Sequence, residues 1–404
     1  MKVKIEKSTL CGDIYPPASK SMAHRLLICA ALADGISEIS KLTPCEDVLA
    51  TVDCLSALGA KIEQVGDTYK IRGANPFNRH KEDEAFKCRE SGSTLRFMIP
   101  LASLSGEETK IYGAPSLLRR PMGVYEKIFS ERGLAFSQDG EKIVLNGALS
   151  AGEYTLRGDV SSQFITGLLF TLPLLDGDST IKIIPPFESR SYIDLTLIAM
   201  REFGVCAEFT DPFTISVKGG QKYKSCNITT EADYSGAAFL DAFSALGSSV
   251  RVLGLSDSSA QGDRVYRELY PALKLGAPEI NIENCPDLGP ILFALAAAFN
   301  GAYFTGTARL RIKESDRAQT MAEELSKFGA KIEIGENFVR VNKSELHAPT
   351  EAILGHNDHR VVMSCAVLLT KFGGVIEGAE AVSKSYPNFF SDIESLGAKV
   401  TIYD

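Results

Sequence analysis

The chain has 404 residues, which is enough for two or three domains that each bury a core. Hydrophobic residues make up 45% and charged residues 23%, an ordinary globular composition that excludes a disordered or low-complexity protein. The net charge of -8 argues against nucleic acid as the main partner, although a local basic cluster can still bind a small anion. The longest apolar run, Ile291 to Phe299, is too short to span a bilayer, so we expect no membrane partner.

The N-terminus and the cysteines indicate the compartment. Val3 and Ile5 alternate with charged residues, which predicts a strand and not a signal peptide. The nine cysteines form no CxxC pair and lie among apolar neighbours, so we expect reduced thiols in a cytoplasmic protein. The sequence has no GxxxxGK motif and no GxGxxG motif after a strand, so we predict neither ATP nor NAD binding and expect no cofactor.

One pattern recurs six times along the chain: an amphipathic helix that ends in Gly, a short strand, a turn and another strand. Gly is common at a helix C-terminus because it accepts a positive φ without steric cost. The polar-apolar alternation that follows it predicts a hairpin. The fourth copy is short and lacks a full hairpin. The six glycines are Gly59, Gly133, Gly204, Gly276, Gly329 and Gly397.

Each repeat has a second, more apolar helix that starts 39 to 42 residues before its glycine. Helices that are apolar nearly all round are buried. Each repeat then reads as βαβαββ, and we predict an α/β (α+β) fold of two similar domains, each of three repeats, with a cleft between them. A solenoid without a cleft is the alternative, but the hairpins resemble sheet edges that must meet other repeats. The apolar helices are expected to start near Ser19, Gly92, Ser162, Tyr234, Leu288 and Asp358.

The unusual polar residues gather at or just before the first turns of these helices. A helix N-terminus presents unpaired N–H groups and a partial positive charge, so Ser, Gly and Thr there let an anion approach closely. Lys and Arg beside them add charge-assisted contacts. We therefore predict a ligand with several negative charges. The strings are PPASKSMAHR, ESGSTLR, LLRRP, DVSSQF, PFESRSYID, CPDLGP, RIKESDR, NDHR and VSKSYP.

Each string has a plainer explanation when it is taken alone. Ser19 serves as an ordinary helix cap, LLRRP is a common surface sequence, and KESDR suits a solvated helix start capped by Ser315. The string HNDHR suggests a metal site through His356, Asp358 and His359, but the sequence offers no matching Cys or carboxylate cluster, so we expect no metal. The shared placement of the strings in repeated helices favours function.

Eight strings, in order and over nearly the whole chain, resemble the 5-enolpyruvylshikimate-3-phosphate synthase family: ASKSMAHR, ESGSTLRF, LLRRPM, SSQFITGLL, PDLGP, RIKESDR, NDHR and SKSYPNFF. The resemblance implies two domains, 19–231 and 1–18 plus 232–404. It implies transfer of the enolpyruvyl group of phosphoenolpyruvate to the 5-hydroxyl of shikimate 3-phosphate, by addition and then elimination, without a cofactor. Both substrates are small anions. A monomer is expected, because residues of both domains of one chain build the site.

The resemblance also implies roles for single residues. Asp287 is expected to take the proton of the 5-hydroxyl and Glu314 to protonate the methylene carbon, with Lys20 and Lys384 assisting proton and charge movements. The residues implied for phosphoenolpyruvate are Lys20, Gly92, Arg120, Gln163, Arg317, Arg360 and Lys384; Gly92 would also contact glyphosate, an inhibitor of the same subsite. Those implied for shikimate 3-phosphate are Lys20, Ser21, Arg25, Ser161, Ser162, Ser189, Tyr192, Asp287 and Lys313.

Three positions depart from the family pattern. Glu90 stands where many members have Asn, and Arg309 and Leu310 replace an Asn and a Trp, so that part of the shikimate pocket differs. Two alternatives of other kinds stay open. One is a UDP-N-acetylglucosamine enolpyruvyl transferase, which uses the same donor. The other is a non-catalytic anion-binding repeat protein, which would not need Asp287 and Glu314 beside the basic set.

Overall fold

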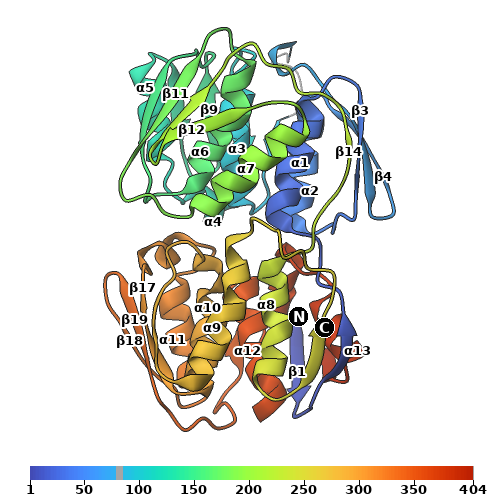
Figure 1. The fold of residues 1–404 in the computed structure, drawn as a ribbon, viewed down its shortest axis with the longest axis vertical. Coiled ribbons are helices and arrows are strands. Elements are labelled where there is room, and N and C mark those ends of the chain that lie inside the picture. The colour runs from blue at the N-terminus through green and yellow to red at the C-terminus, as the bar shows by residue number, and fades with distance from the viewer. Residues whose placement is uncertain (79–84, 404) are drawn as a thin grey trace. The chain divides into compact units, whose positions relative to one another are not determined.

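The computed structural model describes residues 1–78 and 85–403, and it divides into two compact units (Figure 1). The N-terminal domain is Lys20–Glu231, and the C-terminal domain is Met1–Ser19 together with Ala232–Asp404. Ser19, which the sequence prediction put in the N-terminal domain, belongs to the C-terminal one.

The N-terminal domain contains three of the predicted repeats. In chain order its helices and strands are α1 (Lys20–Leu32), β3 (Ile36–Ser40), α2 (Glu46–Ala57), β4 (Lys61–Val65), β5 (Thr68–Arg72), β6 (Phe86–Lys87), α3 (Gly92–Ala102), β7 (Thr109–Tyr112), α4 (Pro115–Leu118), α5 (Gly123–Glu131), β8 (Ala135–Gln138), β9 (Lys142–Asn146), β10 (Glu153–Arg157), α6 (Ser162–Thr171), β11 (Ser179–Ile184), α7 (Arg190–Glu202), β12 (Ala207–Asp211), β13 (Thr214–Val217) and β14 (Asn227–Thr229).

The C-terminal domain contains the other three repeats and the N-terminal strands. Its elements are β1 (Lys2–Glu6), β2 (Cys11–Ile14), α8 (Tyr234–Ala245), β15 (Ser249–Val252), α9 (Tyr266–Leu275), β16 (Glu279–Asn281), α10 (Gly289–Ala298), β17 (Gly301–Thr305), α11 (Arg317–Ser326), β18 (Lys331–Ile334), β19 (Phe338–Asn342), β20 (Ile353–Leu354), α12 (His359–Phe372), β21 (Gly374–Glu377), α13 (Phe389–Ser395) and β22 (Lys399–Tyr403).

Among the residues that the structure describes, five four-stranded sheets share one strand order, which confirms the repeat. A parallel pair leads into an antiparallel hairpin in β6-β7-β9-β8, β10-β11-β13-β12 and β16-β17-β19-β18. The order recurs in β14-β3-β5-β4 and β20-β21-β1-β22. The fourth repeat forms only the two-stranded pair β15-β2, so it lacks the hairpin as predicted.

Two sheets are each completed by a strand that is distant in sequence from the other strands of the sheet. β14, the last strand of the N-terminal domain, pairs in parallel with β3 of the first repeat. β1, at the N-terminus of the chain, inserts between β21 and β22 of the last repeat. Each domain therefore has one four-stranded sheet that is completed by a non-local strand: the sheet of the first repeat in the N-terminal domain and that of the last repeat in the C-terminal domain.

The apolar helices form the interior of both domains, with sheets on either side of them within each domain (Figure 1). They begin at Lys20, Gly92, Ser162, Tyr234, Gly289 and His359, within one residue of every predicted start. In α10 every residue from Gly289 to Ala297 is buried, because a helix without a polar face must be covered all round. In the part of the chain that the structure describes, no helix has the length and apolar character needed to cross a membrane.

The glycines that end the amphipathic helices follow the prediction with one exception. Gly59 and Gly329, for example, have φ values of +108° and +91°, the left-handed region in which a side chain is strained. Gly276 of the short fourth repeat instead has an extended φ of -173°, so the prediction of a positive φ is wrong there. Three residues, 276–278, connect α9 to β16, which pairs in parallel with β17 and does not begin a hairpin.

Candidate active site

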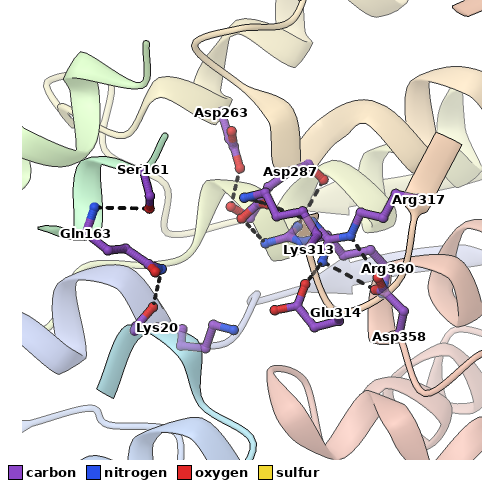
Figure 2. A network of polar contacts seen from close by, with 12 residues as sticks. Lys20, Ser161, Gln163, Asp263, Asp287, Lys313, Glu314, Arg317, Asp358 and Arg360 are labelled. Atoms are coloured by element: carbon purple, nitrogen blue, oxygen red, sulfur yellow. Dashed lines mark hydrogen bonds and ion pairs between the residues drawn. The ribbon is translucent and has the colours of Figure 1, made fainter. Parts of the chain in front are cut away.

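In the N-terminal domain two serines cap the helices that carry predicted ligand residues. The Ser91 side chain accepts a hydrogen bond from the Thr94 N–H at 3.3 Å at the start of α3. The Ser161 side chain accepts one from the Gln163 N–H at 3.3 Å at the start of α6 (Figure 2). Each cap satisfies one of the N–H groups that a helix start leaves unpaired.

Gln163 joins these two helices through its side-chain amide. Its Oε1 accepts from a terminal nitrogen of Arg96 at 2.8 Å, and its Nε2 donates to the Ser93 hydroxyl at 2.8 Å. The Arg96 guanidinium also lies over the Phe164 ring, 5.2 Å from its centroid. The predicted residue Gln163 therefore positions a cation that the predicted site residues did not include.

Gly92 is the first residue of α3, and the guanidinium of Arg120 lies against it. A Cβ built on Gly92 would be 2.6 Å from one terminal nitrogen of Arg120 and 3.1 Å from one of Arg96. The lack of a side chain at Gly92 thus lets two cations approach the helix N-terminus. The arrangement suits an anion that is held by cations and backbone N–H groups together.

Lys20 begins α1, and its ammonium group donates to Asp47 Oδ2 at 2.7 Å. Both side chains are largely buried, with exposed fractions of 17% and 12%. Asp47 was not predicted from the sequence; it lies in the first turn of α2, where a carboxylate suits the helix dipole. The sequence signal available for it was an acidic residue at the start of an amphipathic helix, which is too common to single out.

Four of the residues predicted to contact shikimate 3-phosphate lie where α1 meets α7: Ser21, Arg25, Ser189 and Tyr192. Arg25 donates to Thr196 Oγ1 at 2.9 Å and to the carbonyl oxygens of Tyr192, at 2.9 Å, and Ser21, at 2.5 Å. Burial lowers the pKa of Arg25 to about 10, so its guanidinium is still charged at neutral pH. Its contacts within the domain hold the start of α7 against α1. Ser189 precedes α7, is fully buried and has a left-handed φ of 57°.

In the C-terminal domain the predicted residues form one network around Asp287, which precedes α10. The Asp287 carboxylate accepts from Lys313 at 3.1 Å, from Arg317 at 2.8 Å and from Arg360 at 2.9 Å (Figure 2). Glu314 accepts from Arg317 at 2.6 Å. Three cations and two carboxylates from three separate repeat segments thus share one site, which can bind an anion and transfer protons.

Asp358 holds Arg317 and the start of α12 in this network. Its carboxylate accepts from Arg317 Nε at 2.8 Å, from the Ser315 hydroxyl at 3.0 Å and from the Arg360 N–H at 2.9 Å, which caps α12. Ser315 therefore does not cap α11; Asp316 does, by accepting from the Gln319 N–H. Asp358, one of the three residues considered for a metal site, instead binds Arg317 and caps α12.

The network shifts the pKa values of its members in opposite directions. Burial alone would raise the pKa of the Asp287 carboxyl, but Arg360, Lys313 and Arg317 together lower it well below its usual range. Burial lowers the pKa of the Lys313 ammonium. For Arg317 burial works against the charged form, but Asp358, Glu314 and Asp287 raise its pKa overall. Asp287 is therefore ionised in this state, and its basicity depends on where the cations point.

Asp263 is a site neighbour that the sequence analysis did not identify. It is buried, and its Oδ1 has no hydrogen-bond partner among the described residues, while its Oδ2 accepts from the Ser235 hydroxyl (Figure 2). Burial and the charge of Asp287 raise its pKa to about 6. The signal available was the string AQGD, in which an acidic residue precedes an amphipathic helix, but it occurs in one repeat only.

Lys384 lies near the start of α12 and is largely buried. Its ammonium donates to the Asn357 carbonyl at 2.7 Å. His356 contacts the carboxylate of Glu324. Across residues 1–78 and 85–403, no three His, Cys, Asp or Glu side chains are grouped to hold a metal ion.

The departures from the family pattern are placed as follows. Arg309 and Leu310 are buried in a short 3-10 helix, Ala308–Ile312, which directly precedes Lys313. Glu90 lies between Arg89, which has a left-handed φ of 49°, and the cap Ser91. The remaining predicted residues Ser21 and Ser162 lie in the first turns of α1 and α6.

The fold is that of the enolpyruvyl transferases. A solved EPSP synthase from Acinetobacter baumannii is similar with a TM-score of 0.79 at 23% identity, over 99% of this chain and 100% of that one. The enolpyruvyl transferase NikO from Streptomyces tendae is similar with a TM-score of 0.77 at 15% identity, over 99% and 98% of the two chains.

Sequence relatives narrow the class to one family. The model of the family EPSP synthase (3-phosphoshikimate 1-carboxyvinyltransferase) matches residues 5–393, and this chain belongs to that family. A 3-phosphoshikimate 1-carboxyvinyltransferase of Clostridium kluyveri is 39% identical over 98% of each chain. One of Clostridium beijerinckii is 40% identical over 98% of this chain and 97% of its own. The resemblance seen in the motifs is thereby confirmed.

Proposed function

We propose that this protein transfers the enolpyruvyl group of phosphoenolpyruvate to the 5-hydroxyl of shikimate 3-phosphate. The products are 5-enolpyruvylshikimate 3-phosphate and phosphate, and the step belongs to the shikimate pathway of aromatic amino-acid biosynthesis. The observation that carries the proposal is the cluster of Asp287 and Glu314 with Lys313, Arg317 and Arg360. An anion-binding protein without catalysis needs the cations but not two carboxylates.

The donor is proposed to bind through its phosphate and carboxylate. Arg317 and Arg360 supply planar guanidinium groups from the C-terminal domain, and such groups hold both kinds of anion with two parallel hydrogen bonds. Lys384 completes this set. Lys20, Gly92, Arg120 and Gln163 are the proposed donor contacts of the N-terminal domain. Gly92 suits this role because nothing but hydrogen stands between the start of α3 and the Arg120 guanidinium.

The acceptor is proposed to bind mainly to the N-terminal domain. Its phosphate would take Ser161, Ser162 and Ser189, which lie at the starts of α6 and α7. Lys20, Ser21, Arg25 and Tyr192 are the neighbouring contacts, and Asp287 and Lys313 are the contacts of the C-terminal domain.

The two carboxylates have different proposed tasks. In the addition step Glu314 delivers a proton to the methylene carbon while the 5-hydroxyl oxygen attacks the adjacent carbon and gives its proton to Asp287. In the elimination step the Glu314 carboxylate takes a proton from the new methyl group, the double bond re-forms, and phosphate departs with the proton that Asp287 had accepted. Lys20 and Lys384 assist these proton and charge movements.

Asp287 can act as a base only when its cations are redirected. In the ligand-free network three cations lower the pKa of Asp287, which makes it a weak base. Substrate phosphate and carboxylate groups compete for Arg317 and Arg360. As those cations turn toward the substrates, the pKa of Asp287 rises toward its ordinary value and its basicity with it. Substrate binding is thus proposed to activate the base.

The decisive experiment is an assay of phosphate release with each acceptor. We expect turnover of phosphoenolpyruvate with shikimate 3-phosphate and none with UDP-N-acetylglucosamine. Turnover with the nucleotide sugar alone would contradict the proposal and favour the other transferase. Binding of both anions without phosphate release would favour a non-catalytic protein.

We further propose a monomer that works in the cytoplasm. The location is supported by the cysteines: all nine are unbonded, and Cys54 and Cys88 form no disulfide although their sulfur atoms are 3.7 Å apart. Sedimentation analysis at micromolar concentration tests the monomer, and a concentration-dependent rise in mass would contradict it.

A further inference from the structure

The loop 355–357 connects β20 to α12 and carries an unusual backbone. His356 and Asn357 have consecutive left-handed φ values of 49° and 53°. Residues other than Gly adopt this conformation at a cost, and it persists only where surrounding contacts enforce it. The loop ends at Asp358, whose carboxylate holds Arg317, and the Asn357 carbonyl accepts from Lys384 at 2.7 Å. Lys384, a proposed donor-binding cation, is thus held directly by this loop.

Glu324 contacts both the loop and the strand that precedes it. It lies on α11 and is 1% exposed. Its Oε2 accepts from the Lys327 ammonium at 2.8 Å and from the Leu354 N–H at 2.9 Å, and its Oε1 contacts His356 Nε2 at 2.8 Å. Because an ionised carboxylate only accepts, Nε2 carries a hydrogen in this contact. One buried carboxylate therefore binds Leu354, just before loop 355–357, and His356 within it.

We propose that Glu324 and His356 are positioning residues for donor binding, which act by holding loop 355–357 so that its Asn357 carbonyl keeps Lys384 in place. The proposal rests on the proposed function, because that function makes Lys384 a contact of phosphoenolpyruvate. Neither residue belongs to the anion-binding cluster itself. Lys327 adds a tie, because its ammonium also donates to the Ala352 carbonyl at 2.9 Å.

Two substitutions of His356 separate the contact from the backbone. Asn adopts left-handed φ readily but is too short to reach Glu324 in place of Nε2. Gln places an amide N–H near the position of Nε2. We expect His356→Asn to raise the KM for phosphoenolpyruvate about tenfold, the loss of one hydrogen bond to a charged group. We expect His356→Gln to stay within about twofold of the parent protein.

The readouts are chosen so that a general structural defect would not reproduce them. The Kd of shikimate 3-phosphate, measured by calorimetry, should not change in His356→Asn. In a Lys384→Ala background His356→Asn should raise the donor KM no further, since the residue acts through Lys384. The matched controls are Glu323→Gln, an exposed neighbour of Glu324 on α11, and His347→Ala, an exposed histidine of the same domain. Both should leave the donor KM unchanged.

Three kinetic results would overturn the proposal. They are an unchanged donor KM in His356→Asn, an equal loss in His356→Asn and His356→Gln, and the same additional loss in the Lys384→Ala background. The rate of the parent protein with shikimate 3-phosphate tests the proposed function by itself. Hydrogen exchange gives a readout without turnover: amides of residues 355–358 should exchange faster in His356→Asn than in His356→Gln, and equal rates would contradict the positioning role.

Discussion

Arg317 and Asp358 form an ion pair that is shut off from solvent. The Arg317 Nε donates to Asp358 Oδ2 at 2.8 Å, and the side chains are 1% and 0% exposed. The same guanidinium reaches Asp287 at 2.8 Å and Glu314 at 2.6 Å. One cation therefore contacts three carboxylates and fixes both proposed proton-transfer groups. Its removal would leave buried negative charge without compensation.

Arg317→Ala should therefore destabilise the C-terminal domain strongly. Breaking a buried pair from one side typically costs about 3–5 kcal/mol, because the remaining charge stays buried. Equilibrium unfolding in urea measures the change. Arg311→Ala is the control: Arg311 is exposed and donates to the Gly335 carbonyl, so its loss should cost less than about 1 kcal/mol. Equal losses in the two variants would contradict the central role of Arg317.

The proton-transfer assignment predicts losses of turnover, not of acceptor binding. Asp287→Ala and Glu314→Gln should each lower kcat by roughly 10²–10⁴-fold, the usual contribution of a general acid or base. Calorimetry should still detect shikimate 3-phosphate binding, because the proposed acceptor contacts lie mainly in the N-terminal domain. Normal turnover in either variant would show that the assignment of that residue is wrong.

The raised pKa of Asp263 predicts how the stability of the folded protein depends on pH. Burial and the charge of Asp287 raise its pKa from 3.8 to about 6. Between these values the folded state holds the proton more tightly than the unfolded state, so this residue lowers stability as the pH rises through that window. Above about pH 6 Asp263 is ionised in the folded state, and its full cost in the free energy of unfolding applies. Two pKa units correspond to about 3 kcal/mol, which is an upper value for the penalty.

Asp263→Asn removes this charge and should be stabilising at neutral pH. We expect the free energy of unfolding at pH 7.5 to rise by about 1–3 kcal/mol, and the gain to shrink toward zero at pH 4. Urea unfolding of both proteins at the two pH values measures it. A gain that is the same at both pH values would mean that packing, and not titration of Asp263, is responsible.

The repeat could be predicted from the sequence because its signals are local. Each apolar helix is followed at a constant distance by a helix-ending glycine, and every predicted start lies within one residue of the observed one. The closing strands could not be predicted from the pattern. β14 has three residues, and its partner β3 lies nearly two hundred residues earlier, so only the folded chain reveals the pair.

The site was predictable where cations and small residues interrupt apolar helices. Lys20 and Arg360, for example, lie at the starts of buried helices. A charged residue is not needed to form or bury such an apolar helix, so its presence there indicates function. Two buried carboxylates were not predictable: Asp47, which holds Lys20, and Glu324, which contacts His356. Asp47 and Glu324 lie on amphipathic helices, on which acidic residues are common, and their partners are 27 and 32 residues away in sequence. Their role follows from burial, which the sequence does not show.

The last prediction concerns Gly92, because the guanidinium of Arg120 lies against this residue. A Cβ at position 92 would stand 2.6 Å from a terminal nitrogen of Arg120, closer than such atoms can approach. The guanidinium is the far end of a flexible side chain, so it can move aside at little cost in stability. The methyl group and the displaced cation would then narrow the proposed donor subsite. Gly123→Ala is a matched control, because no atom lies within 4 Å of a Cβ built there.

We expect Gly92→Ala to weaken glyphosate more than phosphoenolpyruvate. An extra methyl group in a filled site typically costs about 1–3 kcal/mol. The longer inhibitor has less room to shift than the donor, so its inhibition constant should rise by a larger factor than the donor KM. The melting temperature should change little, because Arg120 absorbs the clash. Inhibition and donor kinetics of the parent, Gly92→Ala and Gly123→Ala test this. Equal losses for inhibitor and donor would exclude selective narrowing, and a lower melting temperature with unchanged inhibition would mean that Gly92 serves only the turn into α3.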